Sequence, residues 1–272
     1  MEHAFPGTQT ENVSIGSLQD YYSRILEYYD ELFPLDDQAV PCILRLVDKL
    51  KQKAQVTPPP IFRFLGIGCA TGTLENRLAQ YSLDVTGIDA NPDMVATAQR
   101  RIKATFSSIR FFEMNSLDIA SFLKDNSFNL IACIENMLPY LGDYTLVRKF
   151  LHDSKILLAP GGFLLLHVYN FSDSARTAEI TLPELSSIRV KLSRKLVPSD
   201  DDKMSLDAQL ELGNGQLVHY QKKTPILPIT VSQITAFARE TGFNTPEIYS
   251  GYTGAAYDPH STFAVIVLQK PD

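Results

Sequence analysis

The sequence predicts an α/β protein: a seven-stranded, mostly parallel sheet with flanking helices and an antiparallel β insertion before the last helix. Short apolar segments alternate with segments of helical periodicity from residue 61 to residue 170. The alternation stops over residues 171–229, where three segments show partial two-residue alternation, and it resumes at Thr230. Alternating strands and helices predict a parallel sheet covered by helices on both faces.

Local signals place each element. The expected helices are 17–33, 37–53, 73–81, 91–106, 143–158 and 231–240. The expected strands of the main sheet are 61–67, 84–89, 109–114, 128–134, 163–170, 245–251 and 261–270, and those of the insertion are 188–196, 204–212 and 215–223. Asn91 and Thr230 are expected N-caps, Gly242 a helix end, and Asn214-Gly215 a hairpin turn. The prolines of 56–60 predict a rigid connector, and Ala-Pro-Gly-Gly at 159–162 a turn.

These patterns suggest four segments. Residues 1–60 are expected to form an N-terminal helical cap, and residues 61–170 a ligand-binding core. Residues 171–229 are the antiparallel insertion, which we expect to act as a lid or an oligomer contact, with a homodimer as one possibility. Residues 230–272 complete the core.

Composition narrows the class of function. The 272 residues are 44% apolar and 21% charged, as in an ordinary globular protein. The net charge of -6 forms no basic face, so nucleic acid is not an expected partner. No apolar stretch approaches the roughly 20 residues of a membrane span, and the N-terminus lacks a secretory pattern, so we expect a cytoplasmic protein without a membrane partner. The three cysteines, Cys42, Cys69 and Cys133, are widely spaced and form no paired motif, as expected of free thiols in a reducing compartment.

A glycine-rich turn follows the first strand of the main sheet. It reads Gly66-Ile67-Gly68-Cys69-Ala70-Thr71-Gly72 and precedes a helix. Open α/β sheets bind ligands at this edge, where glycine lets the backbone approach a ligand closely. The dinucleotide pattern G-x-G-x-x-G would place its third glycine at Thr71, so the spacing disfavours a nicotinamide dinucleotide.

A carboxylate ends the neighbouring strand. Asp89 lies 17 residues beyond Gly72, at the end of Gly87-Ile88-Asp89. An acid at this strand tip accepts both hydroxyls of a ribose. The glycine turn and the strand-tip acid together indicate a nucleoside site.

With these residues, nearly the whole chain resembles the class I S-adenosylmethionine-dependent methyltransferases. FLGIGCATG (64–72) is similar to the first motif of that family, and VTGIDANPDMVATA to the second. FFEMNSLD (111–118), NSFNLIACIEN (126–136) and LLAPGGFLLL (157–166) resemble later motifs in the same order. The insertion and YYDELFP near the start look most like the bacterial small-molecule branch, which includes glycine, sarcosine and sugar N-methyltransferases.

The resemblance implies a Rossmann-like fold, S-adenosyl-L-methionine as cofactor, and a set of cofactor-binding positions. These are Gly66, Gly68, Cys69, Gly72, Asp89, Ala90, Met94, Asn115, Ser116, Leu117 and Ile134. The chain departs from the family at Gly66, where an Asp or Glu usually helps hold the methionyl ammonium. Glu135 and Asp30 are the expected substitutes, with Glu135 favoured because strands 61–67 and 128–134 should be neighbours.

Methyl transfer is an in-line displacement that requires mainly alignment and exclusion of water. The candidate catalytic residues are Tyr29, Glu135 and Asn136, and Tyr22 and Asn170 are candidate substrate contacts. His167 lies within an apolar strand and is expected to be a packed core residue. The five histidines are scattered, so no metal site is expected.

The methyl acceptor is expected to be a small molecule with a reactive nitrogen or oxygen. The stretch Asn136-Met137-Leu138-Pro139-Tyr140 differs from the Asn-Pro-Pro-Tyr of amino-methyltransferases that act on DNA and protein glutamine. Two other functions remain open at this point. One is a cofactor-binding module that has lost transferase activity and serves a regulatory or scaffolding role, which Gly66 favours; the other is a nicotinamide oxidoreductase.

Overall fold

The computed structural model describes residues 10–14, 18–54, 61–103, 108–172, 178–199 and 203–272. Contacts divide the chain into two compact units. Unit 1 comprises Met1–Pro34 and Ser174–Pro228, and unit 2 comprises Leu35–Asp173 and Ile229–Asp272. The expected cap of residues 1–60 is therefore shared between the units. The expected connector at 56–60 lies outside the described residues.

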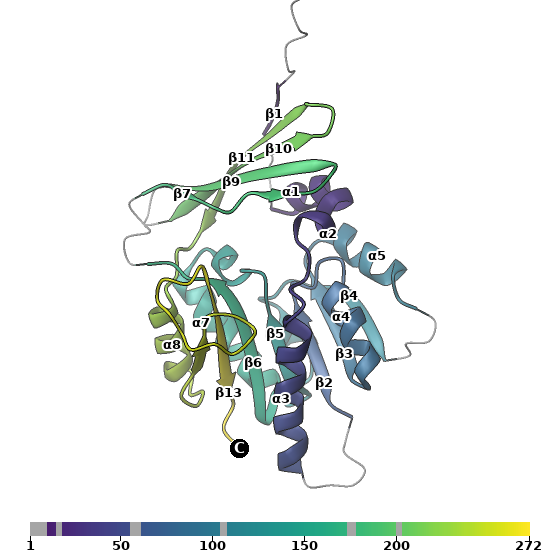
Figure 1. Cartoon of the computed structure of the whole chain (residues 1–272). Coiled ribbons are helices and arrows are strands. Elements are labelled where there is room, and N and C mark those ends of the chain that lie inside the picture. Colours follow the sequence, from purple (N-terminus) through teal and green to yellow (C-terminus); the bar gives the residue numbers. More distant parts are fainter. Residues whose placement is uncertain (1–9, 15–17, 55–60, 104–107, 173–177, 200–202) are drawn as a thin grey trace, which may run out of the picture. The chain divides into compact units, whose positions relative to one another are not determined.

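Unit 2 holds the seven-stranded sheet, in the order β12-β13-β6-β5-β2-β3-β4 (Figure 1). Its strands are β2 (Arg63–Ile67), β3 (Asp84–Asp89), β4 (Ile109–Glu113), β5 (Phe128–Cys133), β6 (Leu158–Tyr169), β12 (Glu247–Tyr249) and β13 (Phe263–Gln269). Strands β2 to β6 pair in parallel, whereas β13 pairs antiparallel with β6 and β12 antiparallel with β13. The predicted seven-stranded, mostly parallel sheet is confirmed.

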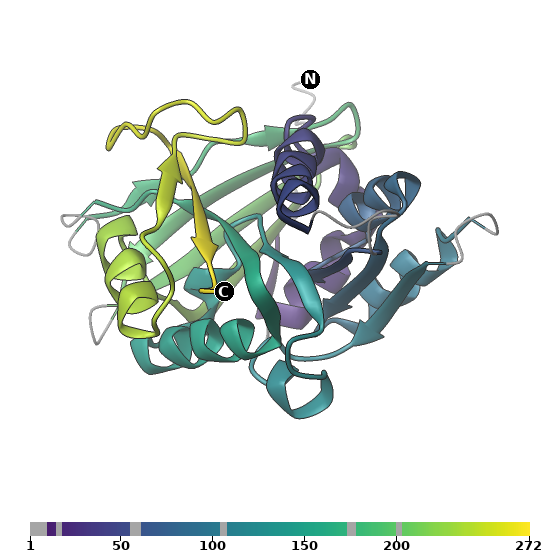
Figure 2. The same ribbon diagram turned by 90° about the horizontal axis from the view of Figure 1, so that it is seen from below.

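The helices of unit 2 cover both faces of this sheet. They are α3 (Ala39–Ala54), α4 (Thr73–Leu78), α5 (Pro92–Arg100), α6 (Ile119–Phe122), α7 (Tyr144–Leu157) and α8 (Val231–Glu240), with 3-10 turns at Ala79–Tyr81 and Leu138–Leu141. Apolar side chains of α3, α4 and α5 form one buried cluster with residues of the strands. Figure 2 shows α3 on one side of the sheet and α7 and α8 on the other. The central strands are buried on both faces, which explains their nearly continuous apolar sequence.

The capping residues predicted from the sequence set two helix starts. The Asn91 side chain accepts hydrogen bonds from the N–H groups of Asp93 and Met94, with Pro92 at the first helical position of α5. Thr230 and Gln233 form a reciprocal capping box at the start of α8. The N-cap of α5 comes two residues after Asp89, so it fixes the backbone beside the expected ribose acid.

Two local expectations need correction. The helix expected over 17–33 is broken into α1 (Leu18–Ile25), a 3-10 turn (Leu26–Tyr28) and α2 (Tyr29–Leu32), with residues 15–17 outside the described residues. Strand β6 begins at Leu158, directly after α7, so residues 159–162 belong to the strand and not to a separate turn. The pairing of β5 with β6 shifts register there, which accommodates these residues as an irregularity of the sheet.

Unit 1 contains a second, six-stranded sheet. Its strands are β1 (Thr10–Ser14), β7 (Ile180–Thr181), β8 (Leu185–Ser186), β9 (Val190–Pro198), β10 (Met204–Leu212) and β11 (Leu217–Ile226). Strands β9, β10 and β11 pair antiparallel, as predicted for the insertion, and β1 adds a parallel edge to β11. Gly215, with φ of 81°, lies in the hairpin turn between β10 and β11, which confirms the Asn-Gly signal.

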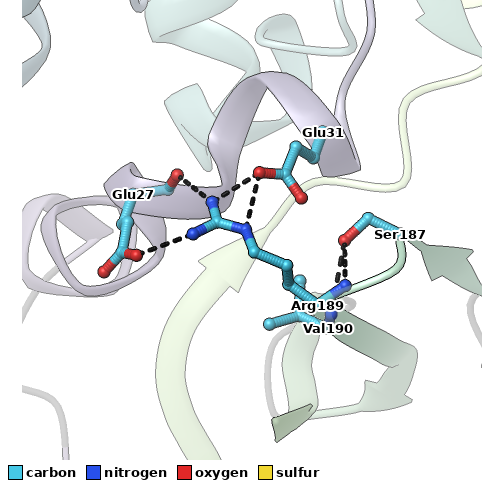
Figure 3. A network of polar contacts seen from close by, with 5 residues as sticks. All are labelled: Glu27, Glu31, Ser187, Arg189 and Val190. Carbon is cyan, nitrogen blue, oxygen red and sulfur yellow. Dashed lines mark hydrogen bonds and ion pairs between the residues drawn. The ribbon is translucent and has the colours of Figure 1, made fainter. Parts of the chain in front are cut away.

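An arginine joins the N-terminal helices to the sheet within unit 1 (Figure 3). The Arg189 guanidinium donates to the Glu27 carboxylate at 2.9 Å, to the Glu31 carboxylate at 2.9 Å and to the Glu27 carbonyl at 3.2 Å. Ser187 Oγ accepts from the N–H groups of Arg189 and Val190, which holds the strand start in place. These contacts explain why residues near the N-terminus and the insertion form one unit.

Candidate cofactor site

The glycine turn forms a tight backbone cradle at the carboxyl end of β2. The N–H groups of Gly68 and Cys69 both donate to the Ile88 carbonyl of β3 at 2.9 Å. Gly68, Ala70 and Gly72 have φ of 72°, 47° and 75°, which is the left-handed region that favours glycine. The turn is thus anchored to the neighbouring strand and strained at Ala70, as binding loops often are.

At two positions near the turn, only glycine fits against the neighbouring side chains. A Cβ atom on Gly72 would stand 2.6 Å from the Phe111 ring and 2.9 Å from Ala98 Cβ. A Cβ atom on Gly87 would also stand 2.6 Å from the Phe111 ring and 3.1 Å from Cys69 Cβ. The two distances to the Phe111 ring are shorter than real Cβ atoms show. The turn, β3 and β4 therefore pack this closely only with glycine at these positions.

Asp89 is fixed against the glycine turn. Its carboxylate accepts from the N–H of Ala70 at 2.9 Å and from the N–H of Asn91 at 2.8 Å. Burial raises the pKa of Asp89, and the hydrogen bonds from the N–H groups of Asn91, Ala70 and Ala90 oppose that rise. Two oxygens of a carboxylate offer about four acceptor positions, so the three N–H donors of this segment leave capacity for at least one ribose hydroxyl.

The segment after β4 turns through Asn115. The Asn115 side-chain oxygen accepts from the N–H of Leu117 at 2.9 Å, and its carbonyl accepts from the N–H of Asp118 at 3.0 Å. Ser116 and Leu117 are half-buried in this turn. Asp118 stands at the N-cap position of α6 but makes no side-chain cap hydrogen bond.

Two further expected cofactor positions are apolar and enclosed. Met94 of α5 is buried, as is Ile134 after β5. Ala90 lies between Asp89 and the α5 cap and is half-buried. These positions border the strand tips that carry the glycine turn and Asp89.

The residues after β5 adopt an uncommon backbone conformation. Glu135 and Asn136 have φ of 57° and 60°, so two consecutive non-glycine residues lie in the left-handed region. Asn136 stabilises this turn, because its side-chain oxygen accepts from the N–H of Tyr169 at 2.7 Å and its own N–H donates to the His167 carbonyl at 3.0 Å. The Asn136 side chain therefore joins the ends of β5 and β6, and the Glu135 side chain is left about two-fifths exposed.

His167 packs in the interior, as expected from its apolar strand. Its ring stacks on Tyr252 and Phe263, with centroids 4.8 Å and 4.9 Å away. Burial lowers the pKa of His167 to about 4, so the imidazole is neutral at physiological pH. Its Nδ1 atom lies 4.0 Å from Glu135 Oε1, beyond hydrogen-bonding distance.

The candidate substrate residues fall in different units. The Asn170 side chain donates to the carbonyls of Pro259 and Ser261 and accepts from the Tyr257 hydroxyl, so it holds the loop before β13. Tyr22 and Tyr29 belong to unit 1, where their rings lie 6.1 Å apart in an edge-on arrangement. Asp30 also belongs to unit 1.

A residue that the sequence analysis did not single out occupies the place of the missing acid. A Cβ atom on Gly66 would stand 1.9 Å from Oε1 of Glu75, a residue in the first turn of α4. Glu75 is only 2% exposed, and its Oε2 atom has no hydrogen-bond partner among the described residues. The sequence signal that could have found it is an acid in the helix directly after a glycine turn whose usual acid is absent.

The charges of Glu75 and Asp89 act on the thiol between them. Burial is the main reason that the pKa of Cys69 lies well above its ordinary value, and the Glu75 and Asp89 carboxylates raise it further. Within the described residues, no group of three or more His, Cys, Asp or Glu side chains is placed to hold a metal ion. Among the helices of the described ranges, none combines the length and hydropathy that a bilayer span requires.

The chain is similar in sequence to known methyltransferases. A family described as "Methyltransferase domain" matches residues 64–162. A protein of Geobacillus sp. (strain WCH70), named as a methyltransferase, is 26% identical over 215 residues, which are 76% of this chain and 84% of that protein. Nodulation protein S of Sinorhizobium fredii is 33% identical over 106 residues, but these span 39% of this chain and about half (47%) of that protein.

Solved structures share the fold over nearly the whole chain. An S-adenosylmethionine-dependent methyltransferase from Clostridium acetobutylicum has a TM-score of 0.74 at 14% identity, covering 93% of this chain and all of that chain. The sugar N-methyltransferase KedS8 from Streptoalloteichus has a TM-score of 0.61 at 15% identity, covering all of both chains. CalS10 from Micromonospora echinaspora, an amino pentose methyltransferase with S-adenosylmethionine bound, has a TM-score of 0.59 at 15% identity, covering 96% of this chain and 99% of that chain.

Proposed function

We propose that the chain is a class I S-adenosylmethionine-dependent methyltransferase and that it methylates a nitrogen or oxygen atom of a small metabolite. The observation that carries the proposal is the cradle at the ends of β2 and β3, where the Ala70 N–H fixes the Asp89 carboxylate beside the glycine turn. S-adenosylmethionine supplies a methyl group on a positively charged sulfur, already activated for displacement. The protein then has to bind the cofactor and the acceptor, align them and exclude water.

The described residues fit this cofactor at both of its ends. Asp89 retains acceptor capacity for a ribose hydroxyl, and the turn at Asn115, Ser116 and Leu117 offers backbone contacts for the adenine. At the other end, the buried Glu75 carboxyl has an oxygen that no described residue hydrogen-bonds. A cationic ligand suits a site with two acids near one glycine turn.

Two features favour a small acceptor. The turn after β5 lacks the Asn-Pro-Pro-Tyr sequence of nucleic-acid and protein amino-methyltransferases, and the net charge is -6. The folds of a sugar N-methyltransferase and an amino pentose methyltransferase are similar to this chain over at least 96% of its length. Amino sugars are therefore the first acceptors to test.

Glu135 is the favoured group to orient or deprotonate the acceptor. It follows β5 at the same sheet edge as the glycine turn, its carboxylate is partly exposed, and its backbone is held in the left-handed region. Asn136 acts as a positioning residue through its bond to Tyr169. Tyr29 remains a predicted catalytic residue, and Tyr22 and Asn170 remain predicted acceptor contacts. Residues 171–229 remain a predicted lid or oligomer contact. A cytoplasmic location also stays a prediction, supported by three free cysteines.

The test is a transfer assay with methyl-labelled S-adenosylmethionine. The purified chain is incubated with amino sugars, other small amines, hydroxylated metabolites and a fractionated metabolite extract. We expect label in a low-mass product, and at least tenfold less of it with the Asp89→Ala variant at a cofactor concentration below the dissociation constant of the parent. Label only in protein or nucleic acid would contradict the small-molecule acceptor.

The second function is a cofactor-binding module without transferase activity, which Gly66 favours because it removes an acid usual in the family. The module predicts tight binding of S-adenosylmethionine and no labelled product from any extract. Labelled product would exclude it.

A further inference from the structure

We propose that Glu75 carries the negative charge that holds the methionyl ammonium of the cofactor, in place of the acid absent from position 66. The inference rests on the methyltransferase function and deepens it by assigning the amino-acid end of the cofactor to a residue of α4. It takes the place of the sequence-based expectation that Glu135 has this role.

The geometry at Gly66 is the main argument. An aspartate at this position would have its carboxyl carbon about 1.5 Å beyond Cβ. Glu75 Oε1 stands 1.9 Å from the position of that Cβ, so the glutamate carboxyl fills the volume that the strand acid would take. The Phe64 ring lies 3.3 Å from the same point, which leaves no space for both side chains. Gly66 and Glu75 thus form a matched pair.

Burial without a partner is the second argument. Buried polar groups in folded proteins are almost always hydrogen-bonded, and an exception needs an explanation. Glu75 is 2% exposed, its Oε2 atom has no hydrogen-bond partner in the part of the chain that the structure describes, and burial raises its pKa to about 8. An incoming ammonium would supply the missing donor and favour the ionised carboxylate.

The position of α4 explains how a helical residue reaches the strand. The Gly72 carbonyl accepts from the N–H and the side-chain amide of Asn76, which fixes the first turn of α4 against the glycine turn. Leu74 and Leu78 are buried on the same helix, so its orientation is set by packing. Glu75 is therefore held under the glycine turn, and its charge raises the pKa of the Cys69 thiol in that turn.

Glu135 is placed differently. It lies after β5, and its Oε1 atom is 4.0 Å from His167 Nδ1, at the end of the neighbouring strand β6. Its partly exposed carboxylate suits a group that meets the acceptor. Glu75 is therefore assigned to the cofactor and Glu135 to the acceptor.

The test is calorimetric titration of the full chain with two ligands. S-adenosylhomocysteine has the amino-acid end, whereas 5′-methylthioadenosine has the same nucleoside without it. We expect Glu75→Gln to weaken binding of S-adenosylhomocysteine at least tenfold and to change binding of 5′-methylthioadenosine less than threefold. Glu240→Gln, an exposed glutamate on α8, is the matched control and should bind both ligands as the parent does.

The titration distinguishes a failure of the proposed methyltransferase function from a failure of the proposed role of Glu75. A parent that binds neither ligand would overturn the methyltransferase function itself. A parent that binds both, with Glu75→Gln unchanged for S-adenosylhomocysteine or equally weakened for both, would overturn only the role of Glu75.

An exchange of the acid provides a second test that does not depend on loss alone. Gly66→Asp should weaken S-adenosylhomocysteine binding at least tenfold, because its side chain collides with the Glu75 carboxyl. The double variant Gly66→Asp with Glu75→Ala should return to within threefold of the parent. A double variant that binds no better than Glu75→Ala would refute the matched pair, with circular dichroism checking that each variant is folded.

Discussion

Replacing Glu75 by glutamine should change how the stability of the protein depends on pH. Burial raises the pKa of Glu75 from 4.5 to about 8, so the folded state favours the protonated carboxyl. A raised pKa in the folded state means that stability is full below pH 4.5 and falls as the pH rises toward 8. Glutamine has nearly the same shape and no charge to desolvate, so it removes this loss.

The size of the effect follows from the two pKa values. Ionisation of Glu75 lowers the free energy of unfolding by about 1 kcal/mol at pH 5, about 3 kcal/mol at pH 7 and about 5 kcal/mol at pH 9. The advantage of Glu75→Gln over the parent should therefore grow by about 4 kcal/mol between pH 5 and pH 9. A constant offset from the buried amide does not alter this difference.

Urea unfolding of the ligand-free protein at pH 5, 7 and 9 measures this difference in the free energy of unfolding between Glu75→Gln and the parent. The chain has 12 tyrosines and no tryptophan, so circular dichroism and tyrosine fluorescence report on unfolding. Both probes are needed because two units can unfold separately. Glu240→Gln, an exposed glutamate, should follow the parent. Parallel pH dependences for Glu75→Gln and the parent would refute the burial argument.

The remaining predictions concern the bound site. Asp89→Ala should weaken S-adenosylhomocysteine binding at least tenfold, since charge-assisted hydrogen bonds contribute roughly 1.5 to 3 kcal/mol each, while Asp118→Ala changes it less than threefold by calorimetry. Binding at pH 7 should release close to one proton from the mostly protonated Glu75, and titration in buffers of different ionisation enthalpy should find no such release in Glu75→Gln. Glu135→Gln should lower kcat at least tenfold with cofactor affinity unchanged, once an acceptor is identified; an equal loss of affinity would place it at the cofactor. Gly72→Ala should abolish binding of S-adenosylhomocysteine, because the φ of Gly72 is 75° and the added carbon collides with the Phe111 ring. Retained affinity would show that the glycine turn can shift to accommodate the side chain.

Much of unit 2 could be predicted because its signals are local. The N-caps at Asn91 and Thr230 and the helix end at Gly242 lie where the sequence indicates, and each depends on residues within a few positions. The seven strands follow from short apolar runs between these signals. The motif order then identifies the sheet edge that carries the glycine turn and Asp89.

Unit 1 could not be predicted in the same way. The N-terminal helices join the insertion through Arg189, which is 158 residues from Glu31 and 162 from Glu27. A charged residue in a strand pattern does not indicate its distant partner. For the same reason the parallel pairing of β1 with β11 has no local signal.

Glu75 illustrates the limit at the candidate site. In sequence it is an acid in the first turn of a helix, a position where a negative charge is ordinarily solvent-exposed and favoured by the helix dipole. Only the packing of α4 against β2 shows that its carboxyl enters the space beside Gly66. A missing family residue is visible in sequence, whereas its replacement from another element depends on the three-dimensional structure.

A crystal structure of the full chain with S-adenosylhomocysteine bound would show which residues hold the two ends of the cofactor. We predict that both ribose hydroxyls donate to the Asp89 carboxylate and that the ammonium lies within hydrogen-bonding distance of Glu75. An ammonium bound at Glu135 with Glu75 still unpartnered, or a ligand outside the glycine turn, would contradict the account.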